Sequence, residues 1–179
     1  KYNDGSEANR PILAERVEEG MRLAWESQVK EPVTAEDVAW AVEPVALPVR
    51  ETLVEETLLA KLTDASLKET DRIRAARDLV FLRRCRGGHR IGIACLSLGE
   101  ARILHLPGEL FVEYQLAAQA MRPGKFTAMA AYGDYGTGYI GTAVSYDQGG
   151  YETGPVSRVG PGSETVLMEA MKRLLNEEP

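Results

Sequence analysis

One continuous stretch, Arg90–Tyr132, decides the fold that we expect for this chain, and it consists of RIGIACLSLGEARILHLPGELFVEYQLAAQAMRPGKFTAMAAY. Over Arg90–Leu98 the apolar side chains fall on both faces, which is typical of a central strand covered on either side. Gly99-Glu100 then makes a tight turn into a second strand, Ala101–Leu106. The stretch therefore predicts two neighbouring strands in the interior of a sheet.

The rest of the same stretch predicts a helix and a third strand. The helix spans about Glu109–Met121, and after Pro123-Gly124 the strand runs over Lys125–Tyr132. Strand, helix and strand in this order predict a right-handed βαβ crossover, because parallel neighbours in a sheet are connected in this way.

Patterns on the N-terminal side predict a helix and an edge strand. Pro11 is well placed to begin a helix that ends near Ser27, with an apolar stripe that is expected to cover a sheet. Val38, Trp40 and Val42 alternate with smaller or polar residues, as in a strand with one buried face, and the prolines that follow favour an edge position. The stripe of the first helix consists of Leu13, Val17, Met21 and Ala24.

Three further helices complete the expected elements. Glu51–Leu62 and Glu69–Arg84 suggest a helical hairpin, and Gly87-Gly88 ends its second helix. A last amphipathic helix follows Ser163, which is a possible N-cap. The buried stripes are expected to be Ile73, Ala76 and Val80 in the second helix of the hairpin, and Leu167, Met171 and Leu174 in the last helix.

Together these elements predict the fold class α/β, with a mixed sheet, a βαβ unit and helices packed on both faces. We find no internal repeat, so the expected organisation is a single domain over residues 1–179, with residues 1–10 as a mobile N-terminal end. The composition agrees with a packed core, since 44% of the residues are hydrophobic and 27% are charged.

Charge and hydropathy exclude several classes of partner. The net charge is −6 and acids outnumber bases 27 to 21, which argues against nucleic acid because phosphates are bound by clustered Lys and Arg. The basic cluster is interpreted as favourable charge at a helix C-terminus and as a solvated turn. No apolar run reaches the roughly 18 residues that a membrane span needs. The cluster consists of Arg83, Arg84, Arg86 and Arg90.

The two cysteines, Cys85 and Cys95, match neither a disulfide framework nor a zinc-binding spacing. For Cys95, which lies on the expected central strand, we predict a place in the core.

In open α/β sheets the ligand site lies beyond the carboxyl ends of the strands, so the residues after Leu106 and Tyr132 are the first candidates. Glu109 follows the first of these strands, and the Tyr-containing segment Gly133–Tyr139 follows the second. Taken alone, Glu109 is better explained as an acid that interacts favourably with a helix N-terminus, which needs no metal. The glycines of the second segment do not form a dinucleotide fingerprint, so we interpret them as turn residues.

Other candidate side chains have plain structural explanations. His105 lies on a strand before Glu109 and is either a replacement metal ligand or a packing residue, and packing is the commoner role. His89 is expected in a solvated turn. Tyr132, Tyr135 and Tyr146 either line a lipid-binding cleft or pack at the ends of strands.

The sequence from Leu98-Gly99-Glu100 to Tyr151-Glu152 resembles the later part of the catalytic domain of the neutral ceramidase family. In that family a strand ends in Pro-Gly-Glu, whose Glu binds zinc, and a later Tyr-containing loop supplies a second ligand. Glu109 and Tyr139 fall on these positions. A Tyr-Glu pair after the loop carries a tyrosine that stabilises the oxyanion, and Tyr151 matches it. The resemblance thus implies Glu109 and Tyr139 as metal ligands and Tyr151 as a catalytic residue.

The departures from the family pattern concern the remaining zinc ligands. The family takes two histidines from an upstream segment, whereas His89 and His105 do not lie in the corresponding motifs, and Gly138 stands where the family has a His before the ligand tyrosine. We therefore expect the chain to be a fragment of a ceramidase-like catalytic domain, which on its own would hold zinc poorly.

The resemblance implies a zinc-dependent amide hydrolase that cleaves an N-acyl bond in a lipid-like or other amide substrate. It also implies secretion or a periplasmic location, and the missing upstream segment of the same protein as a partner. Two alternatives stay open: a non-catalytic binding module that retains the fold, and a hydrolase of the same architecture that acts on an ester.

Overall fold

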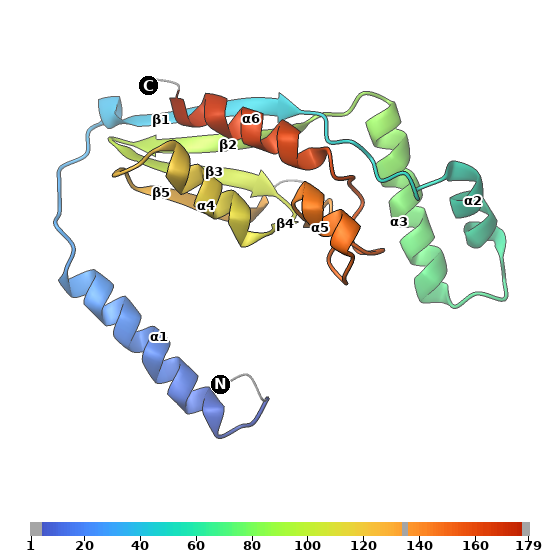
Figure 1. Cartoon of the computed structure of the whole chain (residues 1–179), viewed down its shortest axis with the longest axis horizontal. Coiled ribbons are helices and arrows are strands. Elements are labelled where there is room, and N and C mark those ends of the chain that lie inside the picture. Colours follow the sequence, from blue (N-terminus) through green and yellow to red (C-terminus); the bar gives the residue numbers. More distant parts are fainter. Residues whose placement is uncertain (1–4, 134–135, 177–179) are drawn as a thin grey trace. The chain divides into compact units, whose positions relative to one another are not determined.

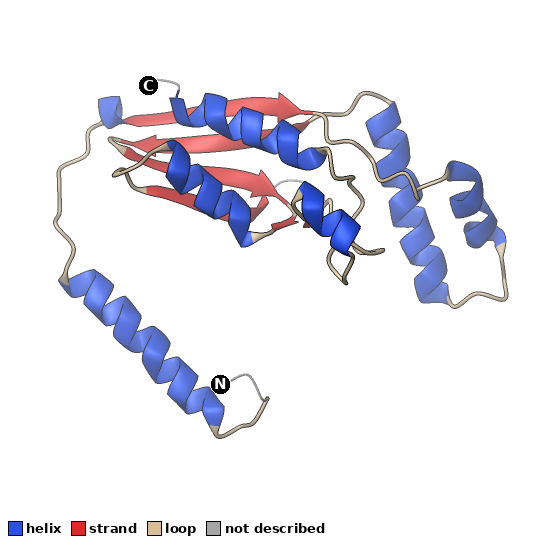
Figure 2. Ribbon diagram, in the orientation of Figure 1, coloured by secondary structure: helices blue, strands red, loops and turns tan. Residues whose placement is uncertain are grey.

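The computed structural model describes residues 5–133 and 136–176 and divides the chain into two compact units, Lys1–Val33 and Thr34–Pro179. Figure 1 labels the helices and strands, and Figure 2 colours them by type. Each unit is described separately.

The first unit contains the helix α1, Asn9–Glu26. Arg22 forms ion pairs at 2.7 Å with Glu19 and with Glu26, one turn away on either side, which support the helix. No residue of α1 is buried and Val17 is 62% exposed, and the expectation that its apolar stripe covers a sheet stays a prediction. Periodicity identifies side chains that share a face, but it does not say what the face contacts.

The second unit is built on a four-stranded mixed sheet with the order β1-β2-β3-β5. The pairs β1/β2 and β2/β3 are antiparallel, and β3/β5 is parallel. The helix α4, Val112–Met121, connects β3 to β5 and contacts β5, which confirms the predicted strand–helix–strand unit. The strands are β1 Val38–Val45, β2 Ile91–Leu98, β3 Ala101–Pro107 and β5 Thr127–Gly133.

Two very short strands form a second, parallel sheet beside the first, β4 Glu109–Leu110 and β6 Tyr139–Ile140. The remaining elements of the second unit are the 3-10 helix η1 Ala35–Asp37 and the helices α2 Glu55–Thr63, α3 Glu69–Arg86, α5 Ala143–Gln148 and α6 Ser163–Asn176.

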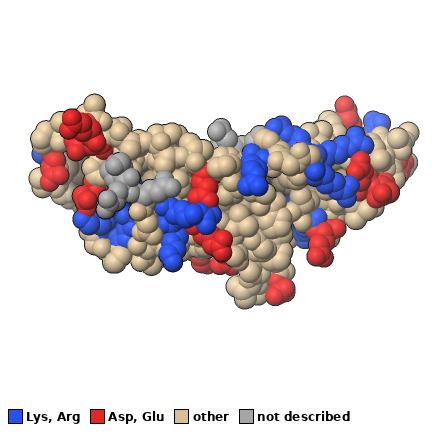
Figure 3. Space-filling view, turned by 90° about the horizontal axis from the view of Figure 1, so that it is seen from above, with Lys and Arg blue, Asp and Glu red and all other residues tan. Residues whose placement is uncertain are grey.

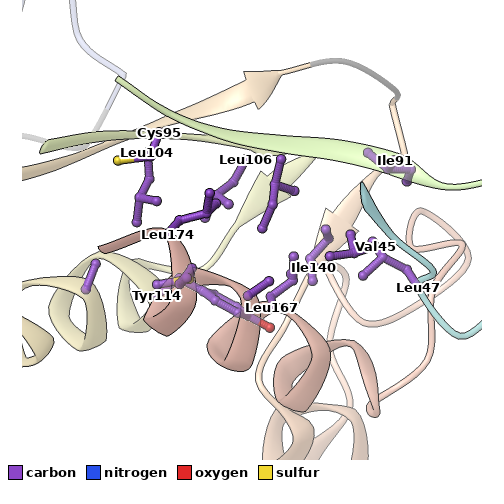
Figure 4. Close-up of a cluster of buried hydrophobic side chains, with 14 of the residues drawn as sticks. Val45, Leu47, Ile91, Cys95, Leu104, Leu106, Tyr114, Ile140, Leu167 and Leu174 are labelled. Atoms are coloured by element: carbon purple, nitrogen blue, oxygen red, sulfur yellow. The ribbon is translucent and has the colours of Figure 1, made fainter. Parts of the chain in front are cut away.

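The main core lies between the sheet and the helices α4 and α6. Leu104 and Leu106 of β3 point from the sheet toward Tyr114 of α4 and Leu167 of α6, and all four are fully buried (Figure 4). Cys95 belongs to the same core, as predicted. The predicted stripe of the last helix is also confirmed, because its three residues Leu167, Met171 and Leu174 are buried.

The opposite side of β1 is open. The predicted strand and its edge position are confirmed. The predicted buried face is wrong, because Val38, Trp40 and Val42 are 45%, 56% and 56% exposed, whereas Val45, on the opposite face of the strand, lies in the core. Helices were predicted on both faces of the sheet. At its β1 end, α6 covers one face, and the described residues of the second unit place no helix on the other.

The hairpin of α2 and α3 has a small core of its own, formed by Leu58, Ala75, Leu79 and Leu82. The stripe predicted for α3 is wrong, since Ile73 and Val80 are more than half exposed. Arginines occur on several sides of this helix, so the sequence does not define its apolar face.

Two arginines of the basic cluster form ion pairs at the C-terminal end of α3. Arg83 and Arg86 each form an ion pair at 2.7 Å with Glu55 of α2. On the face of the molecule seen in Figure 3, groups of basic and of acidic side chains both occur. None of the helices in the described residues combines the length and the apolar character required to cross a membrane.

Candidate functional site: a carboxylate and three tyrosines

Glu109 is positioned by a tight turn at Gly108, directly after β3. Gly108 has a φ of +68°, and a Cβ atom at this residue would lie 2.4 Å from the carbonyl oxygen of Gly138 and from the hydroxyl of Thr137. Only glycine satisfies both conditions. The prediction that Glu109 lies in a helix is wrong, because it begins β4, and α4 starts at Val112. Glu109 is therefore not explained as an acid in the first turn of a helix.

Backbone pairing brings Glu109 next to Tyr139. The two residues are partners in the parallel ladder of β4 and β6. The Glu109 N–H donates to the Gly138 carbonyl at 3.0 Å, and the Phe111 N–H donates to the Ile140 carbonyl at 3.2 Å. Residues that face each other in a ladder project their side chains on the same side. The predicted convergence of the carboxylate and the phenol is thus seen in the structure.

The segment before Tyr139 is fixed by contacts with the 156–158 segment. Gly138 forms an antiparallel bridge with Ser157, and a Cβ on Gly138 would lie 2.0 Å from the Val156 carbonyl oxygen. The Arg158 N–H donates to the Thr137 carbonyl at 3.1 Å. Gly138 therefore serves close backbone packing in a β-bridge, and its interpretation as a turn residue is wrong.

A buried ion pair ties this segment to α3. The Arg158 guanidinium lies 2.7 Å from the Asp78 carboxylate, and the two side chains are only 14% and 11% exposed. The same guanidinium donates to the Gly136 carbonyl at 3.1 Å. The position of Tyr139 thus depends on a charge pair that is largely removed from water.

Two phenols interact with the Glu109 carboxylate. A hydrogen bond to Glu109, together with desolvation and the negative charge nearby, raises the pKa of Tyr139 to about 12. A hydrogen bond to Glu109 also raises the pKa of Tyr132. Both tyrosines are held in the neutral form, in which a phenol donates a hydrogen bond.

Tyr151 lies beside this group. Its ring meets the ring of Tyr139 edge to face, with centroids 5.9 Å apart and planes at 73°. Tyr151 is 68% exposed, so its hydroxyl is accessible to a ligand. The three residues that the resemblance implied, Glu109, Tyr139 and Tyr151, form one continuous group in the structure.

Glu109 and Tyr139 line an open cleft of about 490 Å³. It is bounded by residues from β4, the start of α4, β5, β6 and the loop after α5. The lining residues are Glu109, Leu110, Phe111, Val112, Glu113, Ala131, Tyr132, Tyr139 and Glu152.

The other candidates lie elsewhere. The His105 ring packs against Trp40, with centroids 5.0 Å apart, and does not line the cleft. The Tyr146 hydroxyl is 3.1 Å from the Ser157 hydroxyl, which is a packing role. The positions Asp134 and Tyr135 lie outside the described residues.

The sequence left two roles open for Tyr132, lining a cleft or packing, and gave no role of its own to Glu152; both residues line the cleft. The signal for Tyr132 was its position at the end of the strand before the Tyr139 loop. The backbone of Tyr132 has a φ of +60° and its N–H donates to the Gly108 carbonyl at 2.8 Å, which the sequence pattern does not encode.

The described residues hold a carboxylate next to a phenol. A carboxylate and a phenol lie together, and oxygen donors of this kind bind zinc, but a structural or catalytic zinc ion takes three or four protein ligands. No group of three or more His, Cys, Asp or Glu side chains suited to a metal occurs in residues 5–133 and 136–176. These residues alone therefore do not complete a site for zinc.

The fold of this chain is that of ceramidases. The structure matches the neutral ceramidase from Pseudomonas aeruginosa over 98% of this chain and 34% of that chain, with a TM-score of 0.59 and 15% sequence identity. A structure of a ceramidase complexed with C2 matches over 93% of this chain and 33% of that chain, with a TM-score of 0.57 and 14% identity. This chain spans about a third of the length of these proteins. No family model and no curated protein sequence matches it.

Proposed function

We propose that this chain is the part of a zinc-dependent amide hydrolase of ceramidase type that supplies Glu109 and Tyr139 as metal ligands and Tyr151 as a donor to the substrate. The observation that carries the proposal is the pairing of Glu109 with Tyr139 in β4 and β6, with Tyr151 against Tyr139. The remaining ligands would be histidines from the larger protein. Zinc, when bound, polarises a carbonyl and lowers the pKa of water to about 7.

The three side chains have different tasks in this proposal. Glu109 offers a carboxylate, and Tyr139 offers a phenol oxygen whose proton is released when a cation replaces it. Tyr151 donates its hydroxyl proton in a hydrogen bond to the oxygen on which negative charge develops when an amide carbonyl is attacked. Its exposure leaves room for a substrate at that hydroxyl.

Substrate and location follow from the same proposal. The cleft beside Glu109 contains Leu110, Phe111 and Val112, which suits a lipid-like or other N-acyl amide. We propose a secreted or periplasmic location. Matched amide and ester substrates with the same acyl group would separate amide hydrolysis from ester hydrolysis.

The decisive experiment is metal analysis of the complete gene product. We expect stoichiometric zinc in the unchanged protein and loss of zinc in Glu109→Gln and Tyr139→Phe. Tyr146→Phe is the matched control, because it also removes a hydrogen-bonded phenol but lies outside the cleft. A normally folded protein without zinc, or zinc that persists in both variants, would refute the proposal.

The second candidate function is a binding module that retains the fold without metal chemistry. It is favoured by the absence of a metal-binding group in the part of the chain that the structure describes. In this case the complete gene product would contain no zinc. Glu109→Gln would bind the ligand equally well with a chelator and with added zinc.

A further inference from the structure

A row of buried polar side chains crosses the sheet at the N-terminal ends of β3 and β5, away from the cleft. Ser97 of β2 pairs in register with Arg102 of β3, and Arg102 pairs with Thr127 of β5. The three residues are only 8%, 6% and 4% exposed. Paired residues project on the same side, and Arg102 shares the face of Leu104, two residues later, which lies in the core. The row therefore lies on the inner face of the sheet.

The charge of Arg102 has no acidic partner in this row. Its Nη1 donates to the carbonyl oxygens of Gly99 at 2.6 Å and of Ala101 at 3.1 Å, which are neutral acceptors. The acid in the adjacent turn, Glu100, forms its ion pair with Lys125. No ion pair in residues 5–133 and 136–176 involves Arg102. A buried guanidinium without a negative charge beside it is costly, because nothing offsets its loss of hydration.

Two polar atoms of the row lack a hydrogen-bond partner in the part of the chain that the structure describes. They are Nε of Arg102 and the hydroxyl oxygen of Thr127, and both are closed to solvent. Such atoms are rare in folded proteins, because they lose a hydrogen bond to water without a replacement. A guanidinium N–H only donates and a hydroxyl can donate, so one acceptor would satisfy both.

A second guanidinium adds positive charge near this row. Arg122 follows α4, whose Gln115 donates to the Thr127 carbonyl at 2.9 Å. Nη1 of Arg122 is likewise buried without a partner among the described residues. Burial, and after it the positive charge of Arg102, lowers the pKa of Arg122. The acceptor that suits these surroundings is therefore an anion.

We infer that Arg102 and Thr127 bind a small anion on the inner face of the sheet, with the guanidinium Nε and the hydroxyl as hydrogen-bond donors. The ion has to be small because both side chains are almost fully enclosed. Chloride is the probe that represents this class. The site is separate from the proposed function, since neither residue lines the cleft beside Glu109.

The direct test is a crystal structure of the complete gene product grown with bromide, whose anomalous scattering distinguishes it from water. We expect an anomalous peak within hydrogen-bond distance of Nε of Arg102 and of the Thr127 hydroxyl. Density without an anomalous signal would identify an ordered water. That result, or a carboxylate from another segment of the protein at this place, would overturn the inference.

Thermal unfolding tests the same site in solution. At constant ionic strength, with chloride exchanged for the bulky anion gluconate, we expect the melting temperature of the complete gene product to rise roughly 1–3 °C for each tenfold increase in chloride. Arg102→Met should abolish this response. Lys125→Met is the matched control, because it removes an exposed positive charge at the same end of the sheet, and it should retain the response. Equal responses in the two variants would overturn the inference.

Thr127→Val keeps the test decisive if Arg102→Met does not fold. Valine has nearly the shape of threonine and suits a strand, so the variant removes only the hydroxyl. We expect its affinity for chloride to fall roughly tenfold, as for the loss of one hydrogen bond to a charged group. An unchanged chloride response in Thr127→Val would overturn the inference, whereas the zinc content of the protein bears only on the proposed function.

Discussion

Glu109 and Tyr139 face each other as partners in the parallel ladder of β4 and β6. Both strands are only two residues long, so the pair depends on the turns and contacts that precede each strand. These supports give predictions that do not require a metal.

Gly108→Ala tests the turn before Glu109. The new Cβ would meet the Gly138 carbonyl and the Thr137 hydroxyl and would require a left-handed backbone, so we expect a loss of unfolding free energy of roughly 2–4 kcal/mol in denaturant titrations. Gly124→Ala is the control, since Gly124 also has positive φ but a Cβ there would have no atom within 4 Å, and it should cost roughly 1–2 kcal/mol. Equal losses would contradict the close contact at Gly108.

Tyr139 gives a prediction for pH. Its pKa is raised to about 12 from an ordinary value of 10.0, so the fold favours the protonated phenol. This contribution to stability is fully present below pH 10 and is lost as the pH rises through about 12. Ultraviolet difference titration should show one tyrosine ionising near pH 12, and in Glu109→Gln this pKa should fall toward 10. If the titration of Tyr139 is the same in both proteins, its hydrogen bond to Glu109 is absent in solution.

The pair of Arg158 and Asp78 supports the Tyr139 segment. Asp78→Ala leaves a largely buried guanidinium without its carboxylate, and we expect a loss of unfolding free energy of roughly 3 kcal/mol. Glu55→Ala, which breaks exposed ion pairs with Arg83 and Arg86, should have a much smaller effect. Similar denaturation midpoints for the two variants would mean that the buried pair adds no special stability.

Tyr114 supports the other end of β6. Its buried hydroxyl donates to the Gly141 carbonyl at 3.0 Å, directly after Ile140. Tyr114→Phe leaves this buried carbonyl without its donor, so thermal or chemical unfolding should report a loss of about 1–2 kcal/mol. Unchanged stability would indicate that water takes the place of the phenol.

Tyr151→Phe should separate stability from activity. Tyr151 is 68% exposed, so the variant is expected to unfold like the unchanged protein. In the complete gene product the rate of amide hydrolysis should fall roughly 100-fold or more, because a donor to the developing oxyanion is lost. A rate that stays the same would remove Tyr151 from the catalytic group.

Local patterns predicted the sheet well. The strands β2, β3 and β5 and the stripe of α6 were predicted, because the apolar residues, turn residues or helical spacing that mark each of them lie within a short segment. The N-cap predicted at Ser163 is wrong: its hydroxyl is buried and has no hydrogen-bond partner in the described residues.

Features that depend on distant contacts were not foreseen. Glu109 belongs to β4 only because Tyr139 pairs with it. The local sequence, including Phe111 and Val112, fits a helix that starts at Glu109, whereas α4 starts at Val112. The site residues Glu109, Tyr139 and Tyr151 were reached through a family resemblance, whereas Tyr132 required its backbone angle and its place beside Glu109.

The ladder of β4 and β6 also determines when the chain loses the conformational entropy that forming the site costs. Main-chain hydrogen bonds, not a ligand, bring Glu109 and Tyr139 together. The conformational freedom of the intervening chain is therefore given up during folding, and a ligand that reaches the cleft meets two oxygen donors that are already preorganised.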